Sequence, residues 1–198
     1  MRRWDVFRDV FPTIANLRVL DLGGTVDAWR LAPVRPRHVT VLNLVEPGET
    51  DQEWITPLTG DACAAREALV SAGVEPRFDL VFSNSLIEHV GGHARRNDLA
   101  AEIRRLAPHH WVQTPYRYFP VEPHWLFPGM QFLPTKARVA IARRWPLVHT
   151  RPESYEQARE SVLWTELVGI TEMRSYFPGS AIVRERALGF PKSLIAIR

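Results

Sequence analysis

The sequence predicts an α/β fold in which helices cover a largely parallel sheet, and three observations support this prediction. From the first strand onward, short apolar strands alternate with helical stretches. The first strand, residues 18–22, runs directly into Gly23 and Gly24, which indicates a tight turn whose backbone another group approaches closely. The chain has 198 residues and 45% hydrophobic content, a size that suits one domain, residues 1–198.

The individual elements follow from local patterns. Residues 1–16 should hold an N-terminal helix whose Trp4, Phe7, Val10 and Phe11 share one face. We expect this face to pack on its own domain, with a membrane or a partner as the alternative. The further strands are predicted at 38–45, 54–58, 78–84, 111–114 and as a closing hairpin within 181–197. The further helices are predicted at 63–71, 95–106, 135–145 and 153–167.

The regular alternation stops after the fifth strand. Residues 115–134 combine six aromatic residues with several prolines, too many for a helix or a central strand. Long ordered loops of this kind are usually lids or binding walls, so we expect an aromatic and proline-rich, acceptor-side insertion over residues 116–175. The aromatic residues could instead be ordinary core, and the exposed part of 116–132 could serve a homodimer as well as a ligand.

Composition excludes several classes of function. The net charge is only +3 and the cationic residues are dispersed, without a basic stripe interleaved with aromatics, so we expect no nucleic-acid partner. No segment approaches the roughly 18 apolar residues of a membrane span, so we expect no integral membrane segment. Cys63 is the single cysteine, which excludes an intramolecular disulfide and fits a reducing, cytoplasmic setting.

Three motifs in this order resemble those of class I S-adenosylmethionine-dependent methyltransferases. They are Val19-Leu20-Asp21-Leu22-Gly23-Gly24-Thr25, Gly60-Asp61-Ala62, and the stretch from Phe78 to Val90. The last is the most specific, because an aspartate-led apolar strand, a polar tip and Glu88-His89-Val90 occur together. The resemblance covers nearly the whole chain. It implies a Rossmann-like, seven-stranded mixed sheet in a three-layer sandwich, with an antiparallel strand in the last hairpin.

The resemblance also implies that S-adenosyl-L-methionine is the cofactor. Gly23 and Gly24 would let the backbone approach its methionine part, and Asp21 would organise the loop or meet the amino group through water. Asp61 would accept a hydrogen bond from the adenine amino group. The expected cofactor-binding residues are Asp21, Gly23, Gly24, Thr25, Asn43, Asp61, Ala62, Ser83 and Asn84.

Two positions depart from the usual family pattern. Thr25 stands where a third glycine is usual, and Asn43 stands where a carboxylate usually holds the ribose hydroxyls. An amide can still bond a diol, although without two charge-assisted acceptor bonds. Glu46, three residues further along, could substitute.

Methyl transfer to an alcohol needs alignment of the reactants and a group that takes up the hydroxyl proton. Histidine suits that task, and His89 and His124 are the candidate catalytic residues. The alternative is that His89 caps a helix and His124 braces a loop. The spacing of His89 and His93 could suggest metal ligation, but Gly91 and Gly92 break the helix that would align them, so no metal is expected. The expected substrate-binding residues are Tyr116, Tyr118, Glu122 and Trp125.

The sequence therefore predicts a methyltransferase that acts on a small-molecule acceptor, and we expect O-methylation of a hydroxyl group. The alternative is a non-catalytic, methyltransferase-like binding or regulatory protein, which the altered glycine loop and Asn43 would fit. Nicotinamide-dependent redox chemistry is disfavoured because the full three-glycine fingerprint is absent. The sequence leaves open the acceptor and the oligomeric state.

Overall fold

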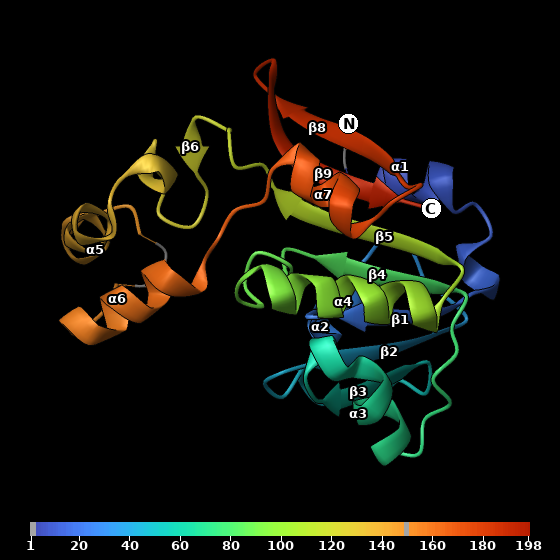
Figure 1. Ribbon diagram of the computed structural model, residues 1–198. Coiled ribbons are helices and arrows are strands. Elements are labelled where there is room, and N and C mark those ends of the chain that lie inside the picture. The colour runs from blue at the N-terminus through green and yellow to red at the C-terminus, as the bar shows by residue number, and fades with distance from the viewer. Residues whose placement is uncertain (1–2, 149–150) are drawn as a thin grey trace.

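A seven-stranded mixed sheet forms the centre of the protein (Figure 1). The computed structural model describes residues 3–148 and 151–198, so residues 1–2 of the expected N-terminal helix and 149–150 of the expected insertion lie outside it. The strand order is β3-β2-β1-β4-β5-β9-β8, and β9 runs antiparallel to both of its neighbours. The strands are β1 Arg18–Leu22, β2 His38–Asn43, β3 Ile55–Thr59, β4 Leu80–Asn84, β5 His109–Pro115, β8 Ala181–Ala187 and β9 Phe190–Ile197. This arrangement confirms the predicted fold class.

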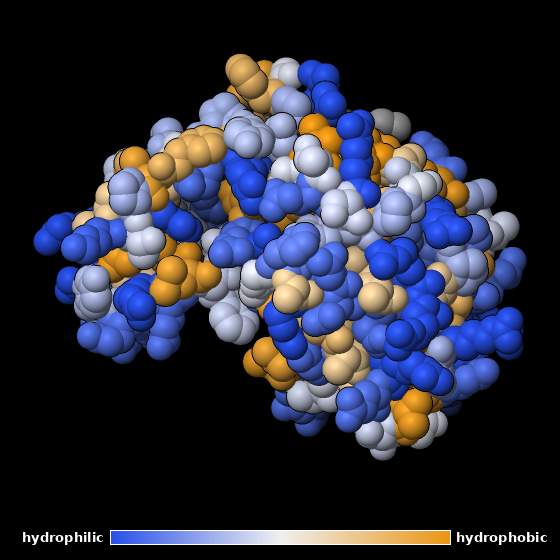
Figure 2. Space-filling view, viewed as in Figure 1, coloured by the Kyte–Doolittle hydropathy of each residue, from blue (hydrophilic) through white to orange (hydrophobic). Residues whose placement is uncertain are grey.

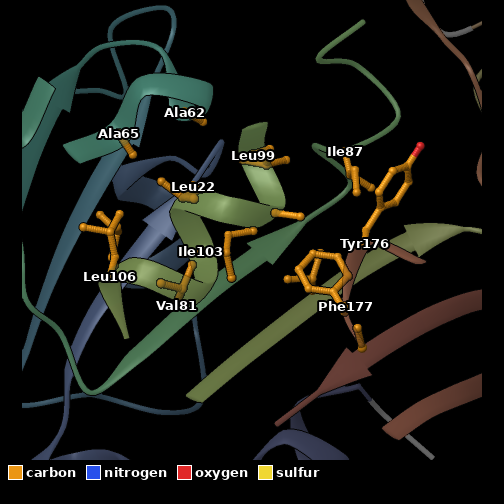
Figure 3. Packing of buried hydrophobic residues seen from close by; sticks show 14 of the residues in the cluster. Leu22, Ala62, Ala65, Val81, Ile87, Leu99, Ile103, Leu106, Tyr176 and Phe177 are labelled. Carbon is orange, nitrogen blue, oxygen red and sulfur yellow. The ribbon is translucent and has the colours of Figure 1, made fainter. Parts of the chain in front are cut away.

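Helices cover both faces of the sheet and give it two cores. One face carries α3 (Ala65–Ser71), α4 (His93–Leu106) and α7 (Ile170–Tyr176), and the other carries α1 (Arg3–Val10) and α2 (Val26–Arg30). Figure 3 shows Leu99, Ile103 and Leu106 of α4 pointing toward Leu22 and Val81 of the central strands. Because strand side chains alternate between faces, the central strands β1, β2, β4 and β5 supply both cores. Short 3-10 turns lie at Ile14–Asn16, Ala62–Ala64 and Met130–Phe132.

The N-terminal helix packs on its own domain, as expected. Phe7 is fully buried, and the ring of Trp4 stacks on Phe82 of β4 with 5.5 Å between centroids. Each buried aromatic side chain removes a large apolar area from water, which holds this short helix on the sheet. None of the helices within residues 3–148 and 151–198 is both long and apolar enough to cross a membrane.

The insertion after β5 forms a lobe with a small core of its own. It contains the two-residue strands β6 (Val121–Glu122) and β7 (Phe127–Pro128), followed by α5 (Thr135–Arg144) and α6 (Tyr155–Trp164). Figure 1 shows α5 and α6 beside the sheet, and the space-filling view in Figure 2 shows a notch between this lobe and the main body. The core of the lobe consists of Trp125, Met130, Val139, Ala142, Ala158 and Val162.

The boundary of the insertion differs from the predicted range, 116–175. Tyr116 bridges Val168, and the Arg117 N–H donates to the Val168 carbonyl at 3.1 Å, so the two ends of the lobe meet there. Helix α7 follows and packs its Met173 and Tyr176 into the main core against α4. This helix is not predicted from the sequence, because its seven residues are too few to show a clear helical period.

Candidate active site

The paired glycines at the end of β1 are required by the protein's own packing. Gly23 has a φ of +83°, and a Cβ at this position would lie 2.8 Å from Leu86 Cδ1. A Cβ on Gly24 would lie 1.8 Å from Asp21 Oδ2. Side chains are therefore excluded at both positions, and the exposed backbone of the turn borders two cavities.

Asp21 is a buried carboxyl group with one satisfied oxygen. It is 2% exposed, and its Oδ2 accepts a 2.7 Å hydrogen bond from Trp29 Nε1, whereas Oδ1 has no partner among the described residues. Burial raises the pKa of Asp21 to about 7, against the lowering effect of the Trp29 bond. Asp21 lines a cavity of about 250 Å³ together with Trp4, Gly23, Gly24, Thr25, Ala28, Trp29, Phe82 and Asn84. A cationic group in this cavity would lie beside a carboxyl group that has one oxygen without a partner among the described residues.

Thr25 and Asn43, the two departures from the family pattern, both have structural roles here. The Thr25 hydroxyl accepts a hydrogen bond from the Ala28 N–H at 3.3 Å and so caps α2. The Asn43 side-chain amide donates to the carbonyls of Gly23 at 3.2 Å and Gly24 at 2.8 Å. A carboxylate has no hydrogen to donate, so the amide at position 43 is what ties the end of β2 to the glycine turn.

A smaller cavity of about 50 Å³ lies on the other side of Gly23, and Asn43, Asp61, Ala62 and His89 line it with others. Asp61 Oδ1 accepts the Cys63 N–H at 2.9 Å, and both Asp61 oxygens accept from Arg95, at 2.9 and 2.8 Å. Burial acts to raise the pKa of Asp61, but these hydrogen bonds and the Arg95 charge lower it overall. Arg95 therefore occupies the acceptor atoms that were expected to receive the adenine amino group.

The two polar residues at the tip of β4 differ in orientation. The Ser83 side chain is fully buried and donates to the Leu22 carbonyl at 3.1 Å, so it joins β4 to β1 and lines neither cavity. Its expected contact with the cofactor is therefore not available to the hydroxyl. Asn84 does line the larger cavity, and its Oδ1 has no partner within the described part of the chain.

The structure brings His89, His124 and Glu122 together in one hydrogen-bonded chain. The Nε2 atoms of His89 and His124 lie 3.1 Å apart, and His124 Nδ1 lies 2.7 Å from Glu122 Oε1. Burial and the His124 charge lower the pKa of His89 to about 4. Burial acts to lower the pKa of His124 as well, but the hydrogen bond and charge of Glu122 and the charge of Glu88 raise it overall. These shifts favour a proton on His124 and a neutral His89.

Glu88 is a member of this cluster that the sequence analysis did not select. Its side chain is fully buried, and its Oε2 accepts the Thr114 hydroxyl at 2.9 Å while Oε1 has no partner among residues 3–148 and 151–198. Burial raises its pKa to about 7, against the opposing effects of its hydrogen bonds. Its position directly before His89, in the Glu88-His89-Val90 motif, is the feature of the sequence that could have identified it.

A third cavity, of about 340 Å³, lies between the insertion and the main body, where Figure 2 shows a hollow with hydrophilic residues around it. Ion pairs organise its wall: Arg96 contacts Glu166 at 2.7 Å, and Arg117 contacts Glu172 at 2.9 Å. The cavity is lined by His93, Arg96, Arg117, Glu122, Gln131, Arg138, Thr165, Glu166, Leu167 and Glu172. It is a polar and charged site.

Of the four residues expected to bind substrate, only Glu122 lines this cavity. Trp125 is 5% exposed and belongs to the core of the lobe. Tyr116 packs against the main core, and Tyr118 is 60% exposed and stacks on Phe132. The aromatic residues Tyr116 and Trp125 therefore act mainly as ordinary core, and Tyr118 lies at the surface.

No protein-family model and no curated protein sequence matches the chain. Solved structures match nearly all of it. A methyltransferase dependent on S-adenosylmethionine from Mesorhizobium loti is 18% identical, with 98% of this chain and 95% of that chain covered and a TM-score of 0.57. Magnesium protoporphyrin IX methyltransferase from Synechocystis PCC 6803, with bound S-adenosylhomocysteine, is 13% identical, with 98% and 78% covered and a TM-score of 0.55.

A third match has a different stated activity. It is a Rhodobacter sphaeroides protein provisionally described as a Zn-dependent alcohol dehydrogenase, 10% identical, with 99% of this chain and 87% of that chain covered and a TM-score of 0.60. At these identities a match establishes the fold, and the reaction must be argued from the site. The strand order and these matches agree: the chain has the fold of the class I S-adenosylmethionine-dependent methyltransferases.

Proposed function

We propose that the protein transfers a methyl group from S-adenosylmethionine to a hydroxyl oxygen of a small-molecule acceptor. The fold supports a methyltransferase, and the related Synechocystis enzyme was crystallised with the demethylated cofactor. The cavity at Asp21 suits the methionine part, because the cofactor's ammonium group would lie beside the Asp21 carboxyl, whose buried Oδ1 has no partner among the described residues. The smaller cavity marks the side for the adenosine part, which would require the half-exposed Arg95 side chain to turn away from Asp61 and the cavity to open.

The observation that carries the proposal is the position of the histidine chain. His89 lines the small cofactor-side cavity, and Glu122 lines the large polar cavity, so Glu122, His124 and His89 connect the two. Methyl transfer is an in-line displacement that needs the acceptor oxygen and the methyl carbon held close together. His89 and His124 are the proposed catalytic residues, which promote loss of the acceptor's hydroxyl proton.

The large cavity also suggests the kind of acceptor. Its wall is built from arginine, glutamate, glutamine and threonine side chains, and such groups bind hydroxyl and other polar groups by hydrogen bonds. We infer a polar, hydroxylated small molecule, with Glu122 as a direct contact and Tyr118 at the outer surface of the lobe. Tyr116 and Trp125 would shape the site from behind. A cytoplasmic location and the absence of a nucleic-acid substrate remain part of this proposal.

Calorimetric titration with S-adenosylmethionine and S-adenosylhomocysteine tests the cofactor. Binding in the micromolar range, roughly −8 kcal/mol, is expected. The absence of heat and of a thermal shift at millimolar ligand would refute the methyltransferase proposal. That result would favour a non-catalytic binding protein, which would also fit the hydrogen bonds that Asn43 and Asp61 make to the protein itself.

The histidine assignment has its own test. His124→Ala should reduce turnover about a hundredfold or more and leave cofactor affinity nearly unchanged, because the variant breaks the Glu122–His124–His89 chain that promotes loss of the acceptor proton. His109→Ala is the matched control, since His109 is exposed at the opposite end of β5. Equal turnover in the two variants would remove His124 from the mechanism.

A further inference from the structure

We propose that Glu88, His89 and His124 bind a divalent first-row transition-metal ion such as Zn²⁺ or Mn²⁺. A carboxylate oxygen of Glu88 and one imidazole nitrogen from each histidine all lie within 4.8 Å of one another. Two imidazoles and one carboxylate form a donor set that binds such ions. Three features favour this site: the distance between the two imidazole rings, the buried Glu88 oxygen without a hydrogen bond, and the hydrogen bonds from His124 to Glu122.

The two imidazole rings are already placed as ligands. Their Nε2 atoms face each other at 3.1 Å. Two histidine ligands at about 2.0–2.1 Å from one ion have nitrogen atoms about 2.9 Å apart in octahedral and about 3.4 Å apart in tetrahedral geometry. The observed separation falls between these values, so an ion would need little movement of either ring.

Glu88 supplies an oxygen that the protein leaves unpaired. Its Oε2 is held by Thr114 at the end of β5, which fixes the carboxylate, whereas Oε1 is buried and without a partner in the described residues. A buried carboxylate oxygen without a hydrogen bond is costly in free energy. Coordination to a cation would satisfy this oxygen.

Glu122 supports the site without being a ligand. Its Oε1 accepts from His124 Nδ1 at 2.7 Å, and its Oε2 accepts the backbone N–H groups of His124 and Trp125 at 2.8 and 3.0 Å. These bonds fix the ring and leave His124 Nε2 directed at His89. Metal-bound histidines commonly have such a carboxylate partner on the other ring nitrogen.

This site differs from the pair considered in the sequence analysis. His93 does not face His89: its Nδ1 lies 2.9 Å from the Tyr176 hydroxyl, and its Nε2 lies 3.0 Å from the Asn97 side-chain amide. The partner of His89 comes instead from the insertion, at position 124, a contact between distant parts of the sequence that spacing alone does not reveal.

The catalytic role of the ion rests on the proposed function, although the site itself does not. Three protein ligands leave coordination positions open, and an acceptor hydroxyl bound there would lose its proton to solvent more readily. The oxygen would then form a bond to the methyl carbon as the carbon–sulfur bond breaks, giving a methyl ether and S-adenosylhomocysteine. In this arrangement the histidines position the ion and do not themselves accept the proton.

Metal binding can be measured without cofactor or acceptor. Protein stripped with a chelator is titrated with Co²⁺, followed by its visible absorption, and with Zn²⁺ and Mn²⁺ by calorimetry. We expect one ion per chain, with a hundredfold or greater loss of affinity in His124→Ala and Glu88→Gln. Glu122→Gln should lose about 10- to 100-fold, as is typical for a partner of a ligating histidine.

His93→Ala is the matched control and should bind the ion as the wild type does, and circular dichroism checks that each variant is folded. Wild-type binding no tighter than that of folded His124→Ala or Glu122→Gln would overturn the site. Binding of S-adenosylhomocysteine without metal binding would remove only this inference. Metal binding without cofactor binding would remove the proposed function and leave the metal site standing.

Discussion

Replacing Asp21 by asparagine should make the protein more stable at alkaline pH. The carboxyl group is buried, and one of its oxygens lacks a partner within the described residues. Asparagine has nearly the same shape, can still accept the Trp29 bond, and is never charged. The substitution therefore removes only the cost of burying a carboxylate charge.

The size of the effect follows from the pKa of Asp21, which burial raises from 3.8 to about 7. The folded state holds the proton more tightly than the unfolded state, so this contribution to stability is complete below pH 3.8 and is lost as the pH rises to about 7. A shift of about three pKa units corresponds to about 4 kcal/mol in total. Between pH 5 and pH 8, the unfolding free energy of the wild type should fall by about 2 to 3 kcal/mol relative to that of Asp21→Asn.

Urea unfolding of both proteins at pH 5, 6, 7 and 8 measures this difference. Asp27→Asn is the matched control, because it makes the same chemical change at a side chain that is 82% exposed. If the difference in unfolding free energy between Asp21→Asn and the wild type stays constant with pH, burial does not raise the pKa of Asp21 and the reasoning is refuted. The same variant should bind S-adenosylmethionine roughly tenfold more weakly, because a hydrogen bond to a charged group contributes about 1.5 kcal/mol.

Three further substitutions test the contacts around the cofactor cleft. Gly24→Ala should destabilise the protein by about 1 to 3 kcal/mol in urea unfolding, because its Cβ would overlap Asp21; unchanged stability would contradict this packing. Asn43→Asp should also lower the unfolding free energy by about 1 to 3 kcal/mol, because a carboxylate would face two carbonyl oxygens. Equal or higher stability would show that the amide does not stabilise the turn. Arg95→Gln should raise cofactor affinity up to about fivefold in calorimetry, because it frees Asp61 from an exposed ion pair that contributes at most about 1 kcal/mol. Weaker binding would mean that Arg95 contacts the cofactor.

The elements that could be predicted from sequence are those with strong local patterns. The strand before Gly23 and the strand before Asn84 have apolar runs that end at polar residues, and the structure has β1 and β4 at those places. The paired glycines could also be identified, because a positive φ and a close approach leave few other residues. These features depend on neighbours in the chain, which a sequence displays directly.

The side-chain roles at the site depend on contacts between distant residues. Whether Trp125 lines a pocket or fills a core depends on α5 and α6, which pack around it. Asn43 bonds a turn at residues 23–24, and Asp61 is paired with Arg95 on α4. No local pattern records such partners, so Trp125 is assigned to a substrate by its residue type and Asn43 to a ribose by its place in the family pattern.

Asp21 and Glu88 each have a carboxylate oxygen without a partner among the described residues, which suits the proposed cofactor and the proposed cation. Asp21 lies next to the last residue of β1 and Glu88 follows β4, so both lie near the edge of the sheet where the parallel strands end, which is where open α/β sheets bind ligands. Each group is fixed on one oxygen, by Trp29 or by Thr114, and each leaves the other oxygen in a buried position. A positive charge at these oxygens would offset the free-energy cost of burying them without a hydrogen bond. Ligand binding at either position should therefore stabilise the protein against unfolding, and each site's share can be separated by adding the cofactor and the metal ion in turn.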